Sequence, residues 1–129
     1  MKKSKEDYIF YRIEKANEAI SDCKLLAENK RWNLCMNRLY YSVFYMVSAL
    51  LLKHNLTIHT HNGTKTKFFS EFVKKGLIDK KFSKLYSDLF DWRQENDYVD
   101  FIDIDEESVI PKLKEVQNFF IEIEKPINS

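Results

Sequence analysis

The chain has 129 residues, enough for one domain with a single core, and its 44% hydrophobic and 32% charged residues are typical of a soluble protein. The formal net charge is +1, but residues 53–84 hold eight lysines and two acids, whereas residues 88–107 hold nine acids and one arginine. This asymmetry favours binding of a polyanion to the basic part and of a basic partner to the acidic part. Two solvated surfaces would give the same pattern. The longest apolar run, residues 39–52, is too short for a bilayer, which excludes a membrane span.

Only two Gly and two Pro interrupt the chain, which favours long helices with short connections. Apolar residues at spacings of three and four predict a first helix over about residues 7–29. A second helix is predicted from Trp32 to about Lys53, and its middle is apolar on nearly all sides, so we expect it to be the most enclosed helix. Its aromatic residues are expected in the core rather than on a ligand-stacking platform; they are Tyr40, Tyr41, Phe44 and Tyr45.

Residues 54–62 lack a helical period and predict a loop, in which His61 either caps the next helix or faces a ligand. Residues 63–75 have a short amphipathic pattern, which Gly76 is placed to end. Asp79 is placed to cap the following helix, along which apolar residues recur at three and four as far as Trp92.

Residues 99–105 alternate apolar and acidic side chains and predict an extended connector. Asp105 or Ser108 caps the last helix, but Pro111 belongs in a first turn and therefore predicts a displaced boundary or a kink. Together these patterns predict an all-α fold: an up-and-down bundle of four to five antiparallel helices, with residues 1–129 in a single domain.

The motifs of several enzyme classes are missing: the sequence has no glycine-rich phosphate loop, no H-E-x-x-H, no Glu-x-x-His pair and no Gly-x-Ser-x-Gly. His59 and His61 lack nearby cysteines as further zinc ligands, and the acidic residues 97–105 lack the pattern of a calcium loop. The sequence therefore predicts no metal and no cofactor. Cys23 and Cys35 form no C-x-x-C motif and no signal peptide is visible, which indicates buried free thiols in a cytoplasmic protein.

Two segments place arginine and tyrosine inside stretches whose apolar spacing predicts buried helix: Asn37-Arg38-Leu39-Tyr40-Tyr41-Ser42 and Arg93-Gln94-Glu95-Asn96-Asp97-Tyr98. Because an unpaired buried guanidinium is costly, each arginine either meets a partner or lines a solvated site. Two such helices predict a shared polar groove, in which two guanidinium groups and hydroxyls suit a phosphate-bearing ligand. The alternative is that Arg93 and Asp97, one turn apart, form an ion pair that only braces the helix.

In order and spacing these segments resemble the HEPN domain, and most closely the short single-domain HEPN proteins of bacteria and archaea. The resemblance covers about residues 8–123 and includes Thr60-His61-Asn62-Gly63, Glu71-Phe72-Val73 and Arg93-x-x-x-Asp97-Tyr98. It implies a helical bundle that often forms a homodimer, with the polar motifs of two subunits brought together. It also implies a toxin, in many members a metal-independent endoribonuclease, encoded beside a minimal nucleotidyltransferase that acts as the antitoxin.

Catalytic members of that family carry an Arg-x(4–6)-His motif, whereas Asp97 and Tyr98 follow Arg93 here and no histidine does. Cleaving RNA without a metal needs a base for the 2′-hydroxyl proton and a group that stabilises the phosphorane. Arg93 suits the second role. Asp97 suits the first only with a raised pKa, which a neighbouring arginine opposes, and His61 could replace it if the fold brings it near.

The residues predicted to act in catalysis are Arg93, Asp97 and Tyr98, and those predicted to bind the substrate are Asn37, Arg38, Tyr41 and His61. The expected ligand is RNA or a nucleotide. One alternative is a non-catalytic module that docks a nucleotidyltransferase partner or a nucleotide, and another is a purely structural bundle in which both motifs are internal braces.

Overall fold

In the computed structural model of the protein, residues 3–98 and 103–128 are described, without the side chains of residues 96–98. The described chain contains no strand, and its helical elements are α1 (Lys5–Glu28), α2 (Trp32–Lys53), α3 (His61–Phe68), the π-helical turn η1 (Phe69–Val73), α4 (Lys80–Tyr98) and α5 (Glu106–Asn128). The predicted all-α helical bundle is confirmed. None of the described helices is long and apolar enough to cross a membrane.

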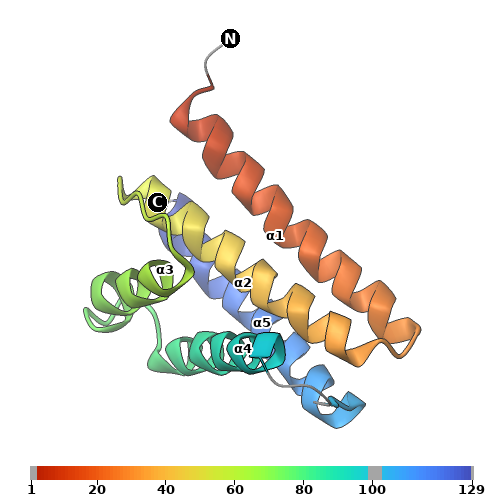
Figure 1. The fold of residues 1–129 in the computed structure, drawn as a ribbon. Coiled ribbons are helices and arrows are strands. Elements are labelled where there is room, and N and C mark those ends of the chain that lie inside the picture. Colours follow the sequence, from red (N-terminus) through yellow and green to blue (C-terminus); the bar gives the residue numbers. More distant parts are fainter. Residues whose placement is uncertain (1–2, 99–102, 129) are drawn as a thin grey trace.

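Helices α1 and α2 form an antiparallel hairpin at one side of the bundle (Figure 1). α1 begins two residues before the predicted start because Ser4 caps it: the Ser4 hydroxyl accepts from the Asp7 N–H, and the Asp7 carboxylate accepts from the Ser4 N–H. The Lys5 ammonium donates to the Lys53 carbonyl, which joins the start of α1 to the end of α2.

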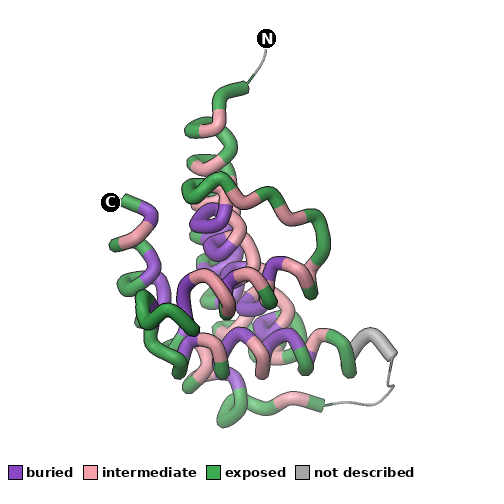
Figure 2. The backbone as a smooth tube through the Cα atoms, turned by 90° about the vertical axis from the view of Figure 1, so that its left-hand side faces the viewer, coloured by how far each residue is buried: buried purple, intermediate pink, exposed green. Residues whose placement is uncertain are grey.

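Helix α2 has the predicted bounds and is the central helix, lying between α1 and α5 and touching α3 and α4 as well. Burial follows this position, since the buried stretches of the tube in Figure 2 lie toward the middle of the bundle. Cys23 on α1 and Cys35 on α2 are buried free thiols, as predicted, and the Cys35 thiol donates to the Cys23 carbonyl. Burial raises the pKa of the Cys23 thiol to about 12, so it stays protonated at neutral pH.

Helices α3 and α4 cross the long helices at a steep angle instead of running along them, as Figures 1 and 2 both show. The prediction that residues 54–62 form a loop is wrong at its end, because α3 begins at His61 and not at Gly63. Thr60, and not His61, caps the helix: its hydroxyl accepts from the Gly63 N–H. Gly76 ends this part of the chain with a φ of +78°, the left-handed conformation that glycine adopts without strain.

The remaining caps follow the prediction. The Asp79 carboxylate accepts from the Lys81 N–H at the start of α4, and the Asp105 carboxylate accepts from the N–H and the hydroxyl of Ser108 at the start of α5. Of the two alternatives predicted at Pro111, the displaced boundary is wrong: α5 starts at Glu106, directly after the Asp105 cap, and passes through Pro111 in its second turn, where the exposed ring removes one backbone donor.

Candidate functional site

The centre of the site lies where the start of α3 and the end of α4 meet α2. The two ends meet because α3 and α4 run in opposite directions across α2. The first residue of α3 therefore lies beside the last turns of α4, and both face the middle of α2. This arrangement brings His61 of α3 and Arg93 of α4 to Tyr40 and Tyr41 of α2.

His61 is held on several sides. Its Nδ1 lies 2.6 Å from the hydroxyl of Tyr40, a side chain with no exposed surface. Phe44 stacks on the imidazole at a centroid distance of 4.3 Å, and the Tyr41 ring meets it edge-on at 6.1 Å. Burial, and then the positive charge of Arg93, lowers the pKa of His61, so the imidazole is neutral at neutral pH.

Both arginines predicted for the site meet on the ring of Tyr41. The guanidinium carbon of Arg38 lies 5.1 Å from the ring centroid, and that of Arg93 lies 5.6 Å from it. Arg93 also lies over the Tyr40 ring at 5.2 Å. Aromatic faces attract cations, so the Tyr41 ring stabilises both guanidinium groups and the Tyr40 ring stabilises that of Arg93. We call these five residues, Arg38, Tyr40, Tyr41, His61 and Arg93, the arginine–histidine cluster.

Asn37 acts on the cluster from its edge. Its side-chain oxygen accepts from Nε and Nη2 of Arg38, at 3.3 and 2.9 Å. These two bonds fix the direction of the Arg38 guanidinium. Asn37 therefore orients Arg38, and among the described residues no other hydrogen bond is made by the Arg38 guanidinium.

The phenol of Tyr40 stays protonated, because burial raises its pKa to about 12 even though the charge of Arg93 opposes that shift. The cluster thus presents two permanent cations and a neutral imidazole, all half-buried, around two aromatic rings. Guanidinium groups bind phosphate oxygens through paired N–H donors, and an imidazole can add one donor or one acceptor. The arrangement suits an anionic ligand.

The structure brings together four of the seven residues predicted for the site: Arg38, Tyr41, His61 and Arg93. Asn37 adjoins them, whereas the side chains of Asp97 and Tyr98 lie outside the described residues. Tyr40 and Phe44 were absent from the predicted set. Tyr40 carried a signal in the sequence, because a buried phenol in a helix that is apolar on nearly all sides needs a hydrogen-bond partner from elsewhere.

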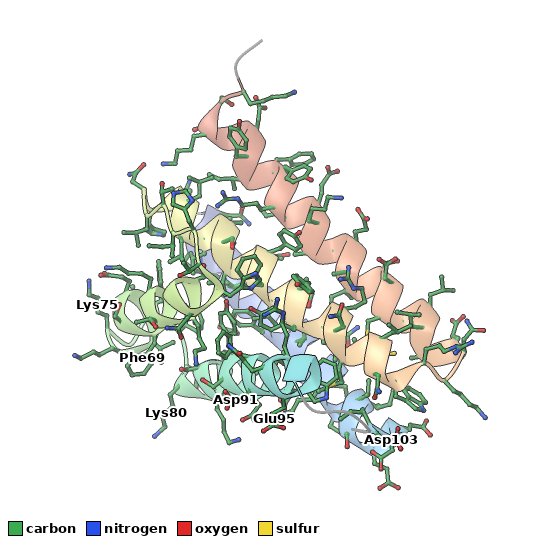
Figure 3. The ribbon with its side chains drawn as sticks, in the orientation of Figure 1. Phe69, Lys75, Lys80, Asp91, Glu95 and Asp103 are labelled. Carbon is green, nitrogen blue, oxygen red and sulfur yellow. The ribbon has the colours of Figure 1, made fainter. Side chains whose placement is uncertain are left out.

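Charge is distributed around the cluster in two groups. Lys75 and Lys80 lie at the far end of the α3–α4 pair, whereas Asp91 and Glu95 lie on the outer side of α4 and Asp103 lies before α5 (Figure 3). Lys65, one turn after His61, places its ammonium 4.2 Å from the centroid of the Phe90 ring. Among the described residues, no group of three histidines, cysteines or acids could hold a metal ion.

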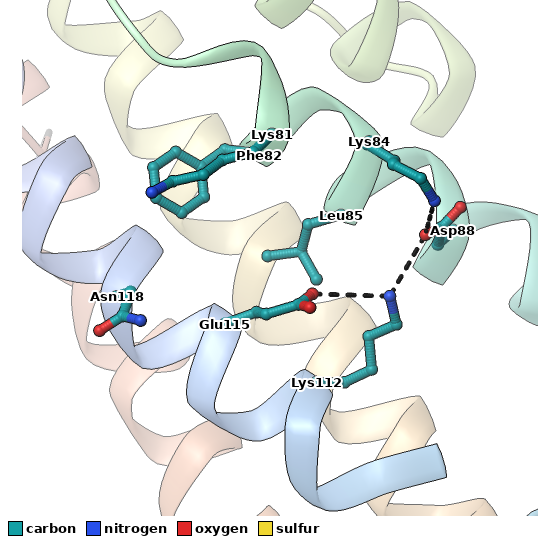
Figure 4. Close-up of a pocket in the computed structure, with 8 residues that line it drawn as sticks. All are labelled: Lys81, Phe82, Lys84, Leu85, Asp88, Lys112, Glu115 and Asn118. Atoms are coloured by element: carbon teal, nitrogen blue, oxygen red, sulfur yellow. Dashed lines mark hydrogen bonds and ion pairs between the residues drawn. The ribbon is translucent and has the colours of Figure 1, made fainter.

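A hollow of about 270 Å³ lies away from the cluster, between α4 and α5 (Figure 4). Most of its charges are already paired: Asp88 accepts from Lys84 and Lys112, and Glu115 lies 3.5 Å from Lys112, whereas the Lys81 ammonium lies over the Phe82 ring. The pairing leaves this hollow with little net charge to offer a ligand, so the arginine–histidine cluster is the stronger candidate.

Fold and cluster together define a small all-α bundle in which two arginines and a histidine from three helices meet on a pair of tyrosines. The family model of the HEPN domain matches residues 10–125 of the chain. A UPF0332 protein of Thermotoga maritima is 39% identical over 123 residues, which cover 95% of this chain and 93% of that protein. The chain belongs to the HEPN domain family.

Two proteins of Methanocaldococcus jannaschii, named "Putative toxin MJ0142" and "Putative toxin MJ0605", are 32% and 35% identical to the chain. The matches cover 74% and 67% of this chain and 65% and 64% of those proteins. The predicted family is thereby confirmed, and the likeness to these two proteins supports a toxin-like HEPN protein.

Proposed function

We propose that this protein is an RNA- or nucleotide-binding HEPN toxin, one component of a toxin–antitoxin or defence pair. The observation that carries the proposal is the meeting of Arg38 and Arg93 on the Tyr41 ring beside the neutral imidazole of His61. Each guanidinium can hold phosphate oxygens through paired N–H donors, so two of them beside one aromatic ring suit a ligand that carries phosphate. Tyr41 and Phe44 are half-buried, and their exposed parts offer a stacking surface for a base.

Under this proposal residues 1–129 form one domain that works in the cytoplasm. Arg93 and Arg38 bind phosphate, and Asn37 orients Arg38. Asp97 and Tyr98 follow Arg93 at the end of α4, so the proposal includes them as residues that orient Arg93 or act in proton transfer and that face the ligand.

The proposed assembly is a homodimer with a nucleotidyltransferase antitoxin as the further partner. Exposed aromatic residues on the first half of α1 support a protein contact, since Tyr8, Phe10 and Tyr11 are each at least half exposed and line a hollow of about 500 Å³. Light scattering should then give twice the chain mass of 15.5 kDa at micromolar concentration. A monomer at that concentration would count against the dimer.

Expression in a host that lacks the neighbouring antitoxin tests the toxin function. Wild-type protein should arrest growth, and Arg93→Ala should relieve the arrest while the variant still accumulates as a folded protein. Lys114→Ala, an exposed cation on α5 away from the cluster, is the matched control and should still arrest growth. RNA cleavage in the presence of a chelator, abolished by Arg93→Ala, would identify the toxin as an endoribonuclease.

The second candidate is a non-catalytic HEPN module that docks a nucleotidyltransferase or a nucleotide. The observation in its favour is that no histidine follows Arg93 in the chain. Such a module should be harmless on expression, yet should retain RNA or a nucleotide through Arg38 and Arg93. Growth without arrest, together with binding that Arg93→Ala removes, would decide for it.

A further inference from the structure

We propose that Tyr40 fixes His61 as a hydrogen-bond donor to the ligand, so that His61 binds a phosphate oxygen through Nε2–H together with Arg38 and Arg93. This inference rests on the proposed function, because it assumes an anionic ligand at the arginine–histidine cluster. It assigns His61 a role that differs from the general base considered from sequence alone, and it makes Tyr40 a positioning residue that acts through His61.

The direction of the hydrogen bond between the two side chains carries the argument. Tyr40 has no exposed surface, and among the described residues its hydroxyl has one hydrogen-bond partner, Nδ1 of His61 at 2.6 Å. If Nδ1 carried a hydrogen and donated it, the phenol hydrogen would lack an acceptor in buried surroundings, which is unfavourable. The phenol therefore donates, Nδ1 accepts, and the hydrogen of the neutral ring resides on Nε2.

The side chains packed around His61 stabilise this orientation and this tautomer of its ring. Phe44 stacks on one face of the ring at 4.3 Å with planes 17° apart, and Tyr41 packs edge-on, so the imidazole cannot turn without displacing an aromatic ring. Among the described residues, the titratable and charged groups that contact His61 or act on its pKa are Tyr40 and Tyr41 from α2 and Arg93 from α4; Lys65 follows one turn along α3. Burial, and then the charge of Arg93, disfavours a second proton on the ring and lowers the pKa of His61.

A neutral donor complements the two arginines. Fixed positive charges bind any phosphate, whereas an N–H group held in one direction also selects the position of one oxygen. His61 is half-buried, so the residue keeps some surface accessible to a ligand. Of the three histidines in the chain, His54 packs against Phe72 and His59 is exposed, and neither has a described contact with Arg38 or Arg93.

Nitrogen NMR of the imidazole tests the assignment without any activity. In wild-type protein labelled with ¹⁵N, the His61 signals, assigned by their loss in His61→Gln, should show a hydrogen on Nε2 and a bare, hydrogen-bonded Nδ1 near pH 7.5. In Tyr40→Phe both tautomers should appear, because the phenol that selects one of them is gone. A hydrogen on Nδ1 in the wild type, or the same tautomer mixture in both proteins, would overturn the proposal.

Binding of a fluorescent single-stranded RNA 12-mer supplies the second arm. His61→Ala should weaken binding by about tenfold, as expected for the loss of one hydrogen bond to a charged group. His61→Gln should weaken it less, because the glutamine amide carries a donor at a similar distance from the backbone. Tyr40→Phe should fall between wild type and His61→Ala.

The two arms separate this inference from the proposed function. If Arg38→Ala and Arg93→Ala weaken RNA binding but His61→Ala does not, the donor role is refuted while the RNA-binding function stands. If wild-type protein does not bind the RNA at all, the RNA-binding function fails, and the tautomer in the NMR spectrum still decides what Tyr40 does to His61. Should His61→Ala fail to fold, His61→Gln and Tyr40→Phe give the same comparison.

Discussion

Tyr40 and Tyr86 pack together in the core with ring centroids 6.3 Å apart, yet their hydroxyl groups differ in environment. The Tyr40 hydroxyl bonds Nδ1 of His61, whereas the Tyr86 hydroxyl is buried without a hydrogen-bond partner among the described residues. The Tyr40 hydroxyl thus connects the core to the arginine–histidine cluster, whereas the Tyr86 hydroxyl is a buried polar group without a hydrogen bond among the described residues. This difference allows each hydroxyl to be tested against the other.

Removing the two hydroxyl groups should have opposite effects on stability. Tyr40→Phe should lower the free energy of unfolding by about 1 kcal/mol, because His61 Nδ1 loses its donor. Tyr86→Phe should leave stability unchanged or raise it by up to about 1 kcal/mol, because it removes a buried polar group that has no partner. Urea unfolding of both variants measures the difference. Equal destabilisation by both substitutions would show that the Tyr40–His61 bond adds no stability.

The bounds of α2 show how much of this fold the sequence contains. The stretch from Trp32 to Lys53 is apolar on nearly all sides in its middle and the helix has these bounds, because the apolar composition of one segment is a local property of the sequence. The cap of α4 by Asp79 is equally local and was equally predictable.

The contacts of His61, in contrast, are not a local property of the sequence. They depend on α3 and α4 crossing α2 at a steep angle, and that angle results from the packing of side chains from three elements, which no local period records. The sequence therefore predicted Arg38, Tyr41, His61 and Arg93 as separate residues of a site, but not that Tyr40 joins them. The predicted roles of Asp97 and Tyr98 remain predictions.

Gly63 should resist substitution although it lies in a helix. Alanine usually stabilises a helix relative to glycine, but a Cβ at Gly63 would lie 2.5 Å from the Thr60 hydroxyl and 2.8 Å from the Ile58 side chain. Gly63→Ala should therefore displace the cap of α3 and lower the free energy of unfolding by about 1–3 kcal/mol. It should also weaken RNA binding, because His61 is the first residue of the same helix.

Gly76→Ala is the matched comparison for that variant. Gly76 has a φ of +78° and open space where a Cβ would lie, so alanine should cost about 1 kcal/mol through backbone strain alone. RNA binding should remain at the wild-type level, because Gly76 lies at the other end of the α3–α4 pair. Loss of binding in both variants would indicate a general effect of stability.

The pH dependence of stability should reveal the His61 environment. Its pKa is lower in the folded protein than its ordinary value of 6.5, because of burial and then Arg93, so protonation favours the unfolded chain. The resulting stability is fully present above about pH 6.5 and is lost as the pH falls through the lowered folded-state pKa. Urea midpoints from pH 8 to pH 5 should fall more steeply for wild type than for His61→Gln.

Carboxylates cannot account for that difference. Asp7, Asp88 and Asp105 have pKa values held below their ordinary value of 3.8, chiefly by hydrogen bonds from Ser4, Lys84 and Ser108 respectively. The stability that they contribute is lost only at more acidic pH. Parallel curves for wild type and His61→Gln between pH 8 and pH 5 would contradict the environment described for His61.

Salt dependence should distinguish a phosphate-binding pair of arginines from two internal braces. If Arg38 and Arg93 contact phosphates, Arg38→Ala and Arg93→Ala should each weaken binding of single-stranded RNA and lower the slope of log affinity against log salt by about 0.7. Lys114→Ala removes an equal charge from an exposed position on α5 and should leave both the slope and the affinity close to wild type.

If the arginines only brace the helices, their loss should lower the melting temperature and leave the slope unchanged. The contacts of Arg93 with the rings of Tyr40 and Tyr41 predict some loss of stability in either case, about 0.5–1 kcal/mol, so the slope is the measurement that decides.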